Sequence, residues 1–69
     1  MRISIKGARV ERSLTQAQAA AKMGVTKETI GNWERGITAP TVPQLIELCK
    51  IYGVEMADIF LPDKLAKSE

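Results

Sequence analysis

The chain has 69 residues, of which 45% are hydrophobic and 26% charged, and its formal net charge is +2. This length suits one small domain and excludes a large enzyme fold or a binding domain joined to a separate effector domain. With one cysteine, no histidine and no apolar run approaching the ~18 residues of a membrane span, we expect a cytoplasmic protein without disulfide, metal or cofactor.

Capping residues mark the beginnings of the predicted helices. Thr15, Thr26 and Thr41 each precede a stretch with helical spacing of apolar residues, as an N-cap residue should. Gln18 and Gln44 lie three residues after Thr15 and Thr41, which is the spacing of a capping box. Three glycines follow such stretches, where a helix often ends in a left-handed residue: Gly24, Gly36 and Gly53. These signals predict five helices, at residues 5–12, 16–23, 27–35, 42–52 and 56–60.

The two ends of the chain carry weaker signals. Ser4 is a candidate cap for the first helix, and an alternating pattern weakly favours a strand at residues 1–5. Pro62 ends the short fifth helix, because proline cannot continue it. We therefore expect one all-α domain over residues 1–62 and a polar tail over residues 63–69.

The apolar residues of these helices fit a single core. On the fourth helix Leu45, Leu48, Cys49 and Tyr52 form a stripe with i, i+3, i+4, i+7 spacing. Cys49 lies within this stripe, so we interpret it as a small buried side chain and not as a reactive thiol. The remaining core candidates are Ile5, Val10, Ala19, Ala20, Met23, Ile30, Trp33, Val54, Met56, Ile59 and Phe60.

The segment from Thr15 to Gly36 predicts two helices joined by a very short turn. The turn is Met23-Gly24-Val25-Thr26, and so tight a connection favours a steep crossing of the two helices, as in a helix-turn-helix. The small side chains at 19–21 let the second helix of the pair approach the first closely.

This unit resembles the helix-turn-helix of the Cro/C1-type (Xre-type) transcriptional regulators, in register over about residues 5–60. No single element is specific, but the ordered set is. The matching residues are Arg9, Leu14, Thr15, Gln16, Ala20, Gly24, Val25, Thr26, Ile30, Trp33, Glu34, Arg35, Gly36, Pro40, Gly53 and Val54. The resemblance implies a compact five-helix, lambda-repressor-like domain that binds double-stranded DNA with the helix at 27–35 in the major groove.

The residue types on that helix fit such a role. Ile30 and Trp33 are expected to face inward, and Gly31 to lie with the polar side chains on the opposite face. Lys27 can donate to guanine O6 or N7, Glu28 can accept from cytosine N4, and Asn32 can bind adenine N6 and N7. Glu28 has an alternative role in compensating the helix dipole.

Phosphate contacts are expected from other positions. Gln16 opens the helix at 16–23, where unpaired N–H groups favour an anion. The resemblance implies that this glutamine binds a phosphate and also braces the helix at 27–35. Further candidates for DNA contact are Thr15, Thr26, Thr29, Arg35 and, through its backbone N–H, Thr38. For Thr15 and Thr26, capping alone is the alternative.

The resemblance assigns a structural role to Arg9 and Glu34. In the family the matching residues form an ion pair that joins the first helix to the end of the third. Two positions depart from the family pattern: Ser13 stands where glycine is usual, and Ala19 where leucine is usual. We expect a left-handed Ser13, and we expect Trp33, Tyr52 or Met23 to fill the volume beside Ala19.

Three classes of function remain to be compared. Residues 1–35 carry a net charge of +4 and residues 36–69 a net charge of −2, which favours an anionic partner for the first half. We expect a DNA-binding regulator, most simply a repressor, that binds a two-fold symmetric operator as a homodimer. The alternative is an antitoxin-like protein-interaction module, with residues 63–69 folding onto a protein partner. An enzyme is disfavoured, because no nucleophile lies beside a base and no carboxylates cluster.

Overall fold

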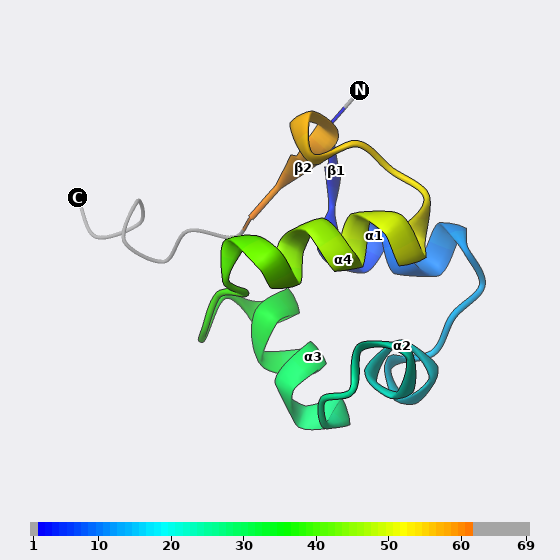
Figure 1. The fold of residues 1–69 in the computed structure, drawn as a ribbon, viewed down its shortest axis with the longest axis vertical. Coiled ribbons are helices and arrows are strands. Elements are labelled where there is room, and N and C mark those ends of the chain that lie inside the picture. Colours follow the sequence, from blue (N-terminus) through cyan, green and yellow to red (C-terminus); the bar gives the residue numbers. More distant parts are fainter. Residues whose placement is uncertain (1, 62–69) are drawn as a thin grey trace.

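A computed structural model describes residues 2–61 of the chain, and Figure 1 shows their arrangement. Four α-helices pack around one core, and the chain ends of this region lie side by side as a two-stranded parallel sheet. The expected polar tail at residues 63–69 lies outside the described residues. The elements are β1 (Ile3–Ser4), α1 (Ile5–Glu11), α2 (Gln16–Met23), α3 (Lys27–Arg35), α4 (Val42–Tyr52), the 3-10 helix η1 (Met56–Asp58) and β2 (Ile59–Phe60).

The capping residues begin the helices where their spacing predicts. Thr15 and Thr41 form complete capping boxes with Gln18 and Gln44, and Ser4 accepts a hydrogen bond from the Gly7 N–H at 2.9 Å. The first helix ends at Glu11, one residue before its expected end. The predictions for the other three α-helices are confirmed.

The fifth helix expected at 56–60 is not confirmed. Met56–Asp58 form a single 3-10 turn, and Ile59–Phe60 continue as the strand β2. This strand pairs in parallel with β1, with Ile3 opposite Ile59 and Ser4 opposite Phe60. The β-branched and aromatic residues at 59 and 60 favour an extended backbone, and β1 offers unpaired backbone groups beside them. Before Pro62, too few residues remain for a stable α-helix.

The core lies where all four helices meet. Figure 1 shows α2 nearly end-on and α3 along the plane of the picture, so the two helices cross at a steep angle. Ala19 is fully buried, as are Trp33 and Tyr52, while Met23 packs against the same cluster. Ala19, which stands where leucine is usual, thus belongs to the same core cluster as the three side chains expected to fill the volume beside it. Ser13, between α1 and α2, has a φ of 60°, so the expected left-handed backbone is present without glycine.

Tyr52 is a polar residue in this core. Its side chain is 2% exposed, and its hydroxyl has no hydrogen-bond partner within residues 2–61. Burial raises the pKa of Tyr52 to about 12, with a further contribution from the negative charge of Glu34, while Arg9 opposes the shift. The unfolded chain, with a tyrosine pKa near 10, therefore loses its proton first as the pH rises.

Raising the pH from 8 to 11 is expected to lower the free energy of unfolding by about 1 kcal/mol through this tyrosine. The loss begins near pH 10 and continues to about pH 12, because between these values only the unfolded state is stabilised by ionisation. Urea unfolding of the wild type and of Tyr52→Phe at both pH values measures it. Tyr52 is the single tyrosine of the chain, so an equal pH dependence in both proteins would contradict the assignment.

Candidate nucleic-acid interface

Helix α3 presents two different faces. Ile30 and Trp33 are 0% and 3% exposed and anchor the inner face in the core. Lys27, Glu28 and Arg35 are exposed on the outside of the helix, and their neighbours Thr29 and Asn32 are half-buried. The inner face fixes the helix through packing, which leaves an outer face of polar side chains available to a partner.

The N-terminal end of α3 is capped by a pair of threonines. Thr26 Oγ1 accepts a hydrogen bond from the Thr29 N–H at 3.2 Å, and the two hydroxyl oxygens are 2.9 Å apart. One hydroxyl donates to the other, which leaves the second hydroxyl proton available to an outside acceptor. Lys27 and Glu28 occupy the first turn beside this cap. The first turn therefore combines unpaired backbone N–H groups with one cation and one anion.

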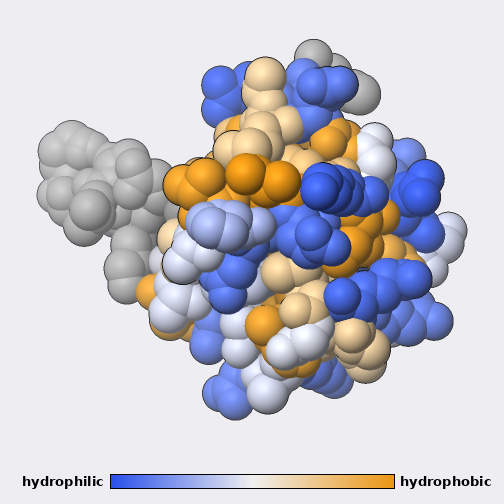
Figure 2. All heavy atoms as spheres, in the orientation of Figure 1, coloured by the Kyte–Doolittle hydropathy of each residue, from blue (hydrophilic) through white to orange (hydrophobic). Residues whose placement is uncertain are grey.

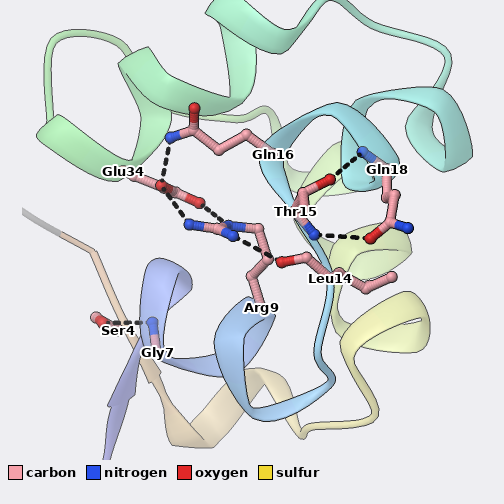
Figure 3. A network of polar contacts seen from close by, with 8 residues as sticks. All are labelled: Ser4, Gly7, Arg9, Leu14, Thr15, Gln16, Gln18 and Glu34. Carbon is pink, nitrogen blue, oxygen red and sulfur yellow. Dashed lines mark hydrogen bonds and ion pairs between the residues drawn. The ribbon is translucent and has the colours of Figure 1, made fainter.

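Helix α2 begins with a similar cap. Thr15 accepts from the Gln18 N–H at 3.0 Å and its own N–H donates to Gln18 Oε1 at 2.9 Å (Figure 3). Both contacts are exposed, so the Thr15 hydroxyl proton remains accessible at the helix N-terminus.

A network of four hydrogen bonds joins three segments of the chain around Glu34. Arg9 donates from Nε to Glu34 Oε2 at 2.7 Å, and from Nη2 to Glu34 Oε1 at 3.4 Å. Arg9 also donates from Nη1 to the Leu14 carbonyl at 2.7 Å, which holds the loop before α2. Gln16 completes the network by donating from Nε2 to Glu34 Oε1 at 2.9 Å (Figure 3). The Arg9 and Glu34 side chains are 9% and 4% exposed, so this ion pair lies inside the fold.

Gln16 links this network to the outer surface. Because a carboxylate can only accept, Glu34 fixes the amide of Gln16 with its nitrogen inward. The second N–H of that nitrogen stays available as a donor at the start of α2. The structure thus places Gln16 against α3 and leaves it able to contact an anion.

Arg35 lies against α3 and covers Gly31. Its Nη2 donates to Asn32 Oδ1 at 2.8 Å. A Cβ added at Gly31 would lie 3.4 Å from Arg35 Nη1 and 3.6 Å from Gln16 Nε2. Gly31 is accordingly buried, whereas the sequence predicted it on the exposed face. The i, i+3 spacing of Asn32 and Arg35 was the available signal for this contact, and it was missed.

Thr38 follows α3 in the loop before α4. Its backbone N–H, the expected donor to a phosphate, points to the Asn32 carbonyl at 3.5 Å. The Ile37 N–H donates to the same carbonyl at 3.0 Å, and these bonds close the end of α3. The residue is exposed, so its side chain remains on the surface.

The described residues hold neither a cluster of metal ligands nor a helix that could span a membrane. Residues 2–61 bring together no group of three or more His, Cys, Asp or Glu side chains able to hold a metal ion. None of the helices in this region combines the length and the apolar character that a membrane crossing requires. Burial raises the pKa of the Cys49 thiol, and Glu55 adds to the shift, which makes the thiolate less accessible.

Residues 5–59 match the protein family described as helix-turn-helix. The chain is 38% identical over 55 residues to the cryptic phage CTXphi transcriptional repressor RstR of Vibrio cholerae, a match that spans 80% of this chain and 50% of that protein. It is 34% identical over 61 residues to an uncharacterised HTH-type transcriptional regulator of Methanocaldococcus jannaschii, spanning 88% of this chain and 92% of that protein. A third relative, an uncharacterised HTH-type transcriptional regulator of Archaeoglobus fulgidus, is 31% identical over 64 residues, or 93% and 90% of the two chains. The chain thus spans half the length of the phage repressor and about nine-tenths of the two archaeal relatives.

Proposed function

Because the chain belongs to the Cro/C1-type helix-turn-helix family of transcriptional regulators, we propose that it is a sequence-specific repressor that binds double-stranded DNA as a homodimer. The observation that carries the proposal is the outer face of α3. This face holds polar side chains of medium length, on a helix whose inner face is locked into the core. An α-helix of this kind fits the major groove, where each base pair presents a distinct set of donors and acceptors.

Base contacts are assigned to the first two turns of α3. Lys27 and Glu28 are exposed in the first turn, and Asn32 follows Glu28 by one helical turn. Thr29 lies between them beside the cap, and Arg35 continues the same side of the helix. A good contact from one such side chain to a base is worth ~1–3 kcal/mol of discrimination against the wrong base.

Phosphate contacts are assigned to the two helix N-termini. Gln16 retains one amide N–H after bonding Glu34, the capping hydroxyl of Thr15 retains its proton as a donor, and so does one hydroxyl of the Thr26–Thr29 pair. Backbone N–H groups at the start of α2 and α3 add to the attraction for an anion. Thr38 is assigned a contact through its exposed side chain, since its N–H is directed to Asn32. These contacts position the protein, while α3 reads the bases.

We propose that a second copy of the chain covers the apolar side chains that are exposed on α4 and at the end of the described chain. Val42 and Ile46 are 65% and 41% exposed and lie one turn apart on α4. Phe60, the last residue of β2, and Leu61, which follows it, are also exposed. Figure 2 shows hydrophobic side chains gathered where β2 meets the first half of α4 in this view. A dimer joined here would present two copies of α3 to a two-fold symmetric site.

Repression is proposed from the phage relative, which is named a transcriptional repressor. A small domain that occupies an operator can act by excluding polymerase, without any further activity. The relative is twice as long as the matched segment, so the role of its remaining residues is not transferred.

Enrichment of random duplex DNA by the purified protein at about 150 mM salt tests the proposal. We expect a palindromic consensus whose half-site centres lie about 10 base pairs apart, bound by two chains per duplex. Absence of any consensus would contradict sequence-specific binding. A consensus bound by a single chain would contradict the proposed dimer but not sequence-specific binding.

A protein-interaction module is the second candidate, favoured by the same exposed apolar side chains. The dependence of binding on salt concentration distinguishes the two functions. Binding to DNA releases counterions and weakens steeply as salt rises, whereas an apolar protein contact does not. A chain that bound duplex DNA equally well at 50 and 200 mM salt would contradict the proposed mode of binding.

A further inference from the structure

The contact between Arg35 and Asn32 changes what the outer face of α3 can recognise. Arg35 Nη2 donates to Asn32 Oδ1 at 2.8 Å across one turn of the helix. The guanidinium lies over Gly31, where even a Cβ would be in contact with Nη1 at 3.4 Å. Gln16 closes the other side of the same space, with its Nε2 at 3.6 Å from that Cβ position. The arginine therefore folds back along the helix beside Gly31.

This contact orients the amide of Asn32. Its oxygen faces the guanidinium, so its nitrogen, with two N–H donors, faces the other way. A guanidinium carries donors and no acceptor. The two side chains together thus present a row of donors, and the one acceptor among them is already engaged by a charged partner.

We propose that Arg35 and Asn32 act as one unit that reads guanine, in place of the adenine that an isolated asparagine would select. This inference rests on the proposed function and names the base that the site prefers. Guanine presents two adjacent acceptors, O6 and N7, to the major groove, and the donor row can bind both. Adenine presents N7 beside an amino group, which is a donor. To bind the Asn32 oxygen, this amino group would have to share it with the Arg35 guanidinium, and it would then lie against the N–H groups of the guanidinium. In this unit Arg35 is the specificity-determining residue.

The test compares the DNA consensus enriched by four proteins: the wild type, Asn32→Ala, Arg35→Ala and Lys50→Ala. The position read by the unit is the one whose preference disappears with Asn32→Ala. In the wild type we expect guanine there, preferred over adenine by about tenfold or more. With Arg35→Ala the amide oxygen is released, and the preference at this position is expected to change to adenine. Lys50→Ala removes the same charge from the exposed side of α4 and is expected to keep guanine.

Two outcomes of this comparison would overturn the inference while leaving the proposed function intact. One is adenine at this position in the wild-type consensus. The other is an Arg35→Ala protein that keeps guanine and binds every sequence more weakly, since Arg35 would then contact only phosphate. Absence of a consensus for the wild type would instead contradict the proposed function, and this inference with it.

A measurement without DNA tests the contact itself. We expect the side-chain amide of Asn32 to be ordered in the wild type, with an NMR order parameter above about 0.6, and to fall below that value in Arg35→Ala. Gly31→Ala is the matched variant, because its Cβ would be in ordinary contact with the guanidinium and should leave the amide ordered. An Asn32 amide equally mobile in the wild type and in Arg35→Ala would overturn the inference whatever DNA the protein prefers.

Discussion

Replacement of Glu34 by alanine is expected to lower the free energy of unfolding by about 3–5 kcal/mol. The change leaves the guanidinium of Arg9, which is 8% exposed as a residue, inside the fold without its carboxylate partner. It also removes the acceptor that holds the amide of Gln16. A domain of this size has a total stability of roughly 3–10 kcal/mol, so the variant should be largely unfolded or close to it.

Urea unfolding followed by far-UV circular dichroism measures this effect. Glu28→Ala is the matched control, because it removes the same residue type from an exposed position on the same helix, and we expect a change below about 1 kcal/mol. The double variant Arg9→Met with Glu34→Leu should be more stable than Glu34→Ala, since no buried charge is left unpaired. If the free energy of unfolding of Glu34→Ala lay within about 1 kcal/mol of the wild-type value, the ion pair would not hold the helices together.

The helix boundaries could be predicted because their signals are local. Thr15 with Gln18, and Thr41 with Gln44, satisfy each other within four residues, and no distant partner is needed to recognise them. The left-handed glycines at the helix ends act over a similarly short range.

The sheet could not be predicted in the same way. An alternating pattern weakly favoured a strand at residues 1–5, and β1 forms within that range. Its partner β2 lies almost the whole described chain away, and two residues are too few for a period of two to show there. Sequence reasoning expected a short fifth helix at residues 56–60, ended by Pro62. Pairing with β1 is favoured over that helix, because it satisfies backbone groups that a single short turn would leave to water.

The outer face of α3 was predicted in its residue types but not in its contacts. Sequence reasoning treated Asn32 and Arg35 as separate donors and acceptors, although they are three residues apart on one helix. It also treated Gly31 as exposed, because nothing local shows that Arg35 and Gln16 would fill the space above it. The conformation of a side chain that lies along a surface depends on residues from other elements. The spacing of residues within one helix does not show which residues these are.

Lys27→Glu is expected to weaken DNA binding by more than about tenfold while leaving the fold as stable as before, or more so. Lys27 is exposed at the first residue of α3, next to the cap residue Thr26. A carboxylate there is favoured by the helix dipole, by up to about 1 kcal/mol, whereas the native cation is not. The same substitution is expected to lower the affinity for DNA, because a base or phosphate contact is lost and a charge that repels DNA is added.

Paired measurements on Lys27→Glu test most directly the claim that the outer face of α3 reads DNA. They are fluorescence anisotropy with the enriched duplex and urea unfolding of the same protein, with Lys50→Glu on α4 as the control for the change of charge. The account predicts that affinity falls by more than about tenfold for Lys27→Glu and by much less for Lys50→Glu. It predicts no loss of stability for Lys27→Glu and a loss of up to about 1 kcal/mol for Lys50→Glu, which places an anion in the last turn of α4. An unchanged affinity in Lys27→Glu, or an equal fall in both variants, would contradict the assignment of this face to DNA.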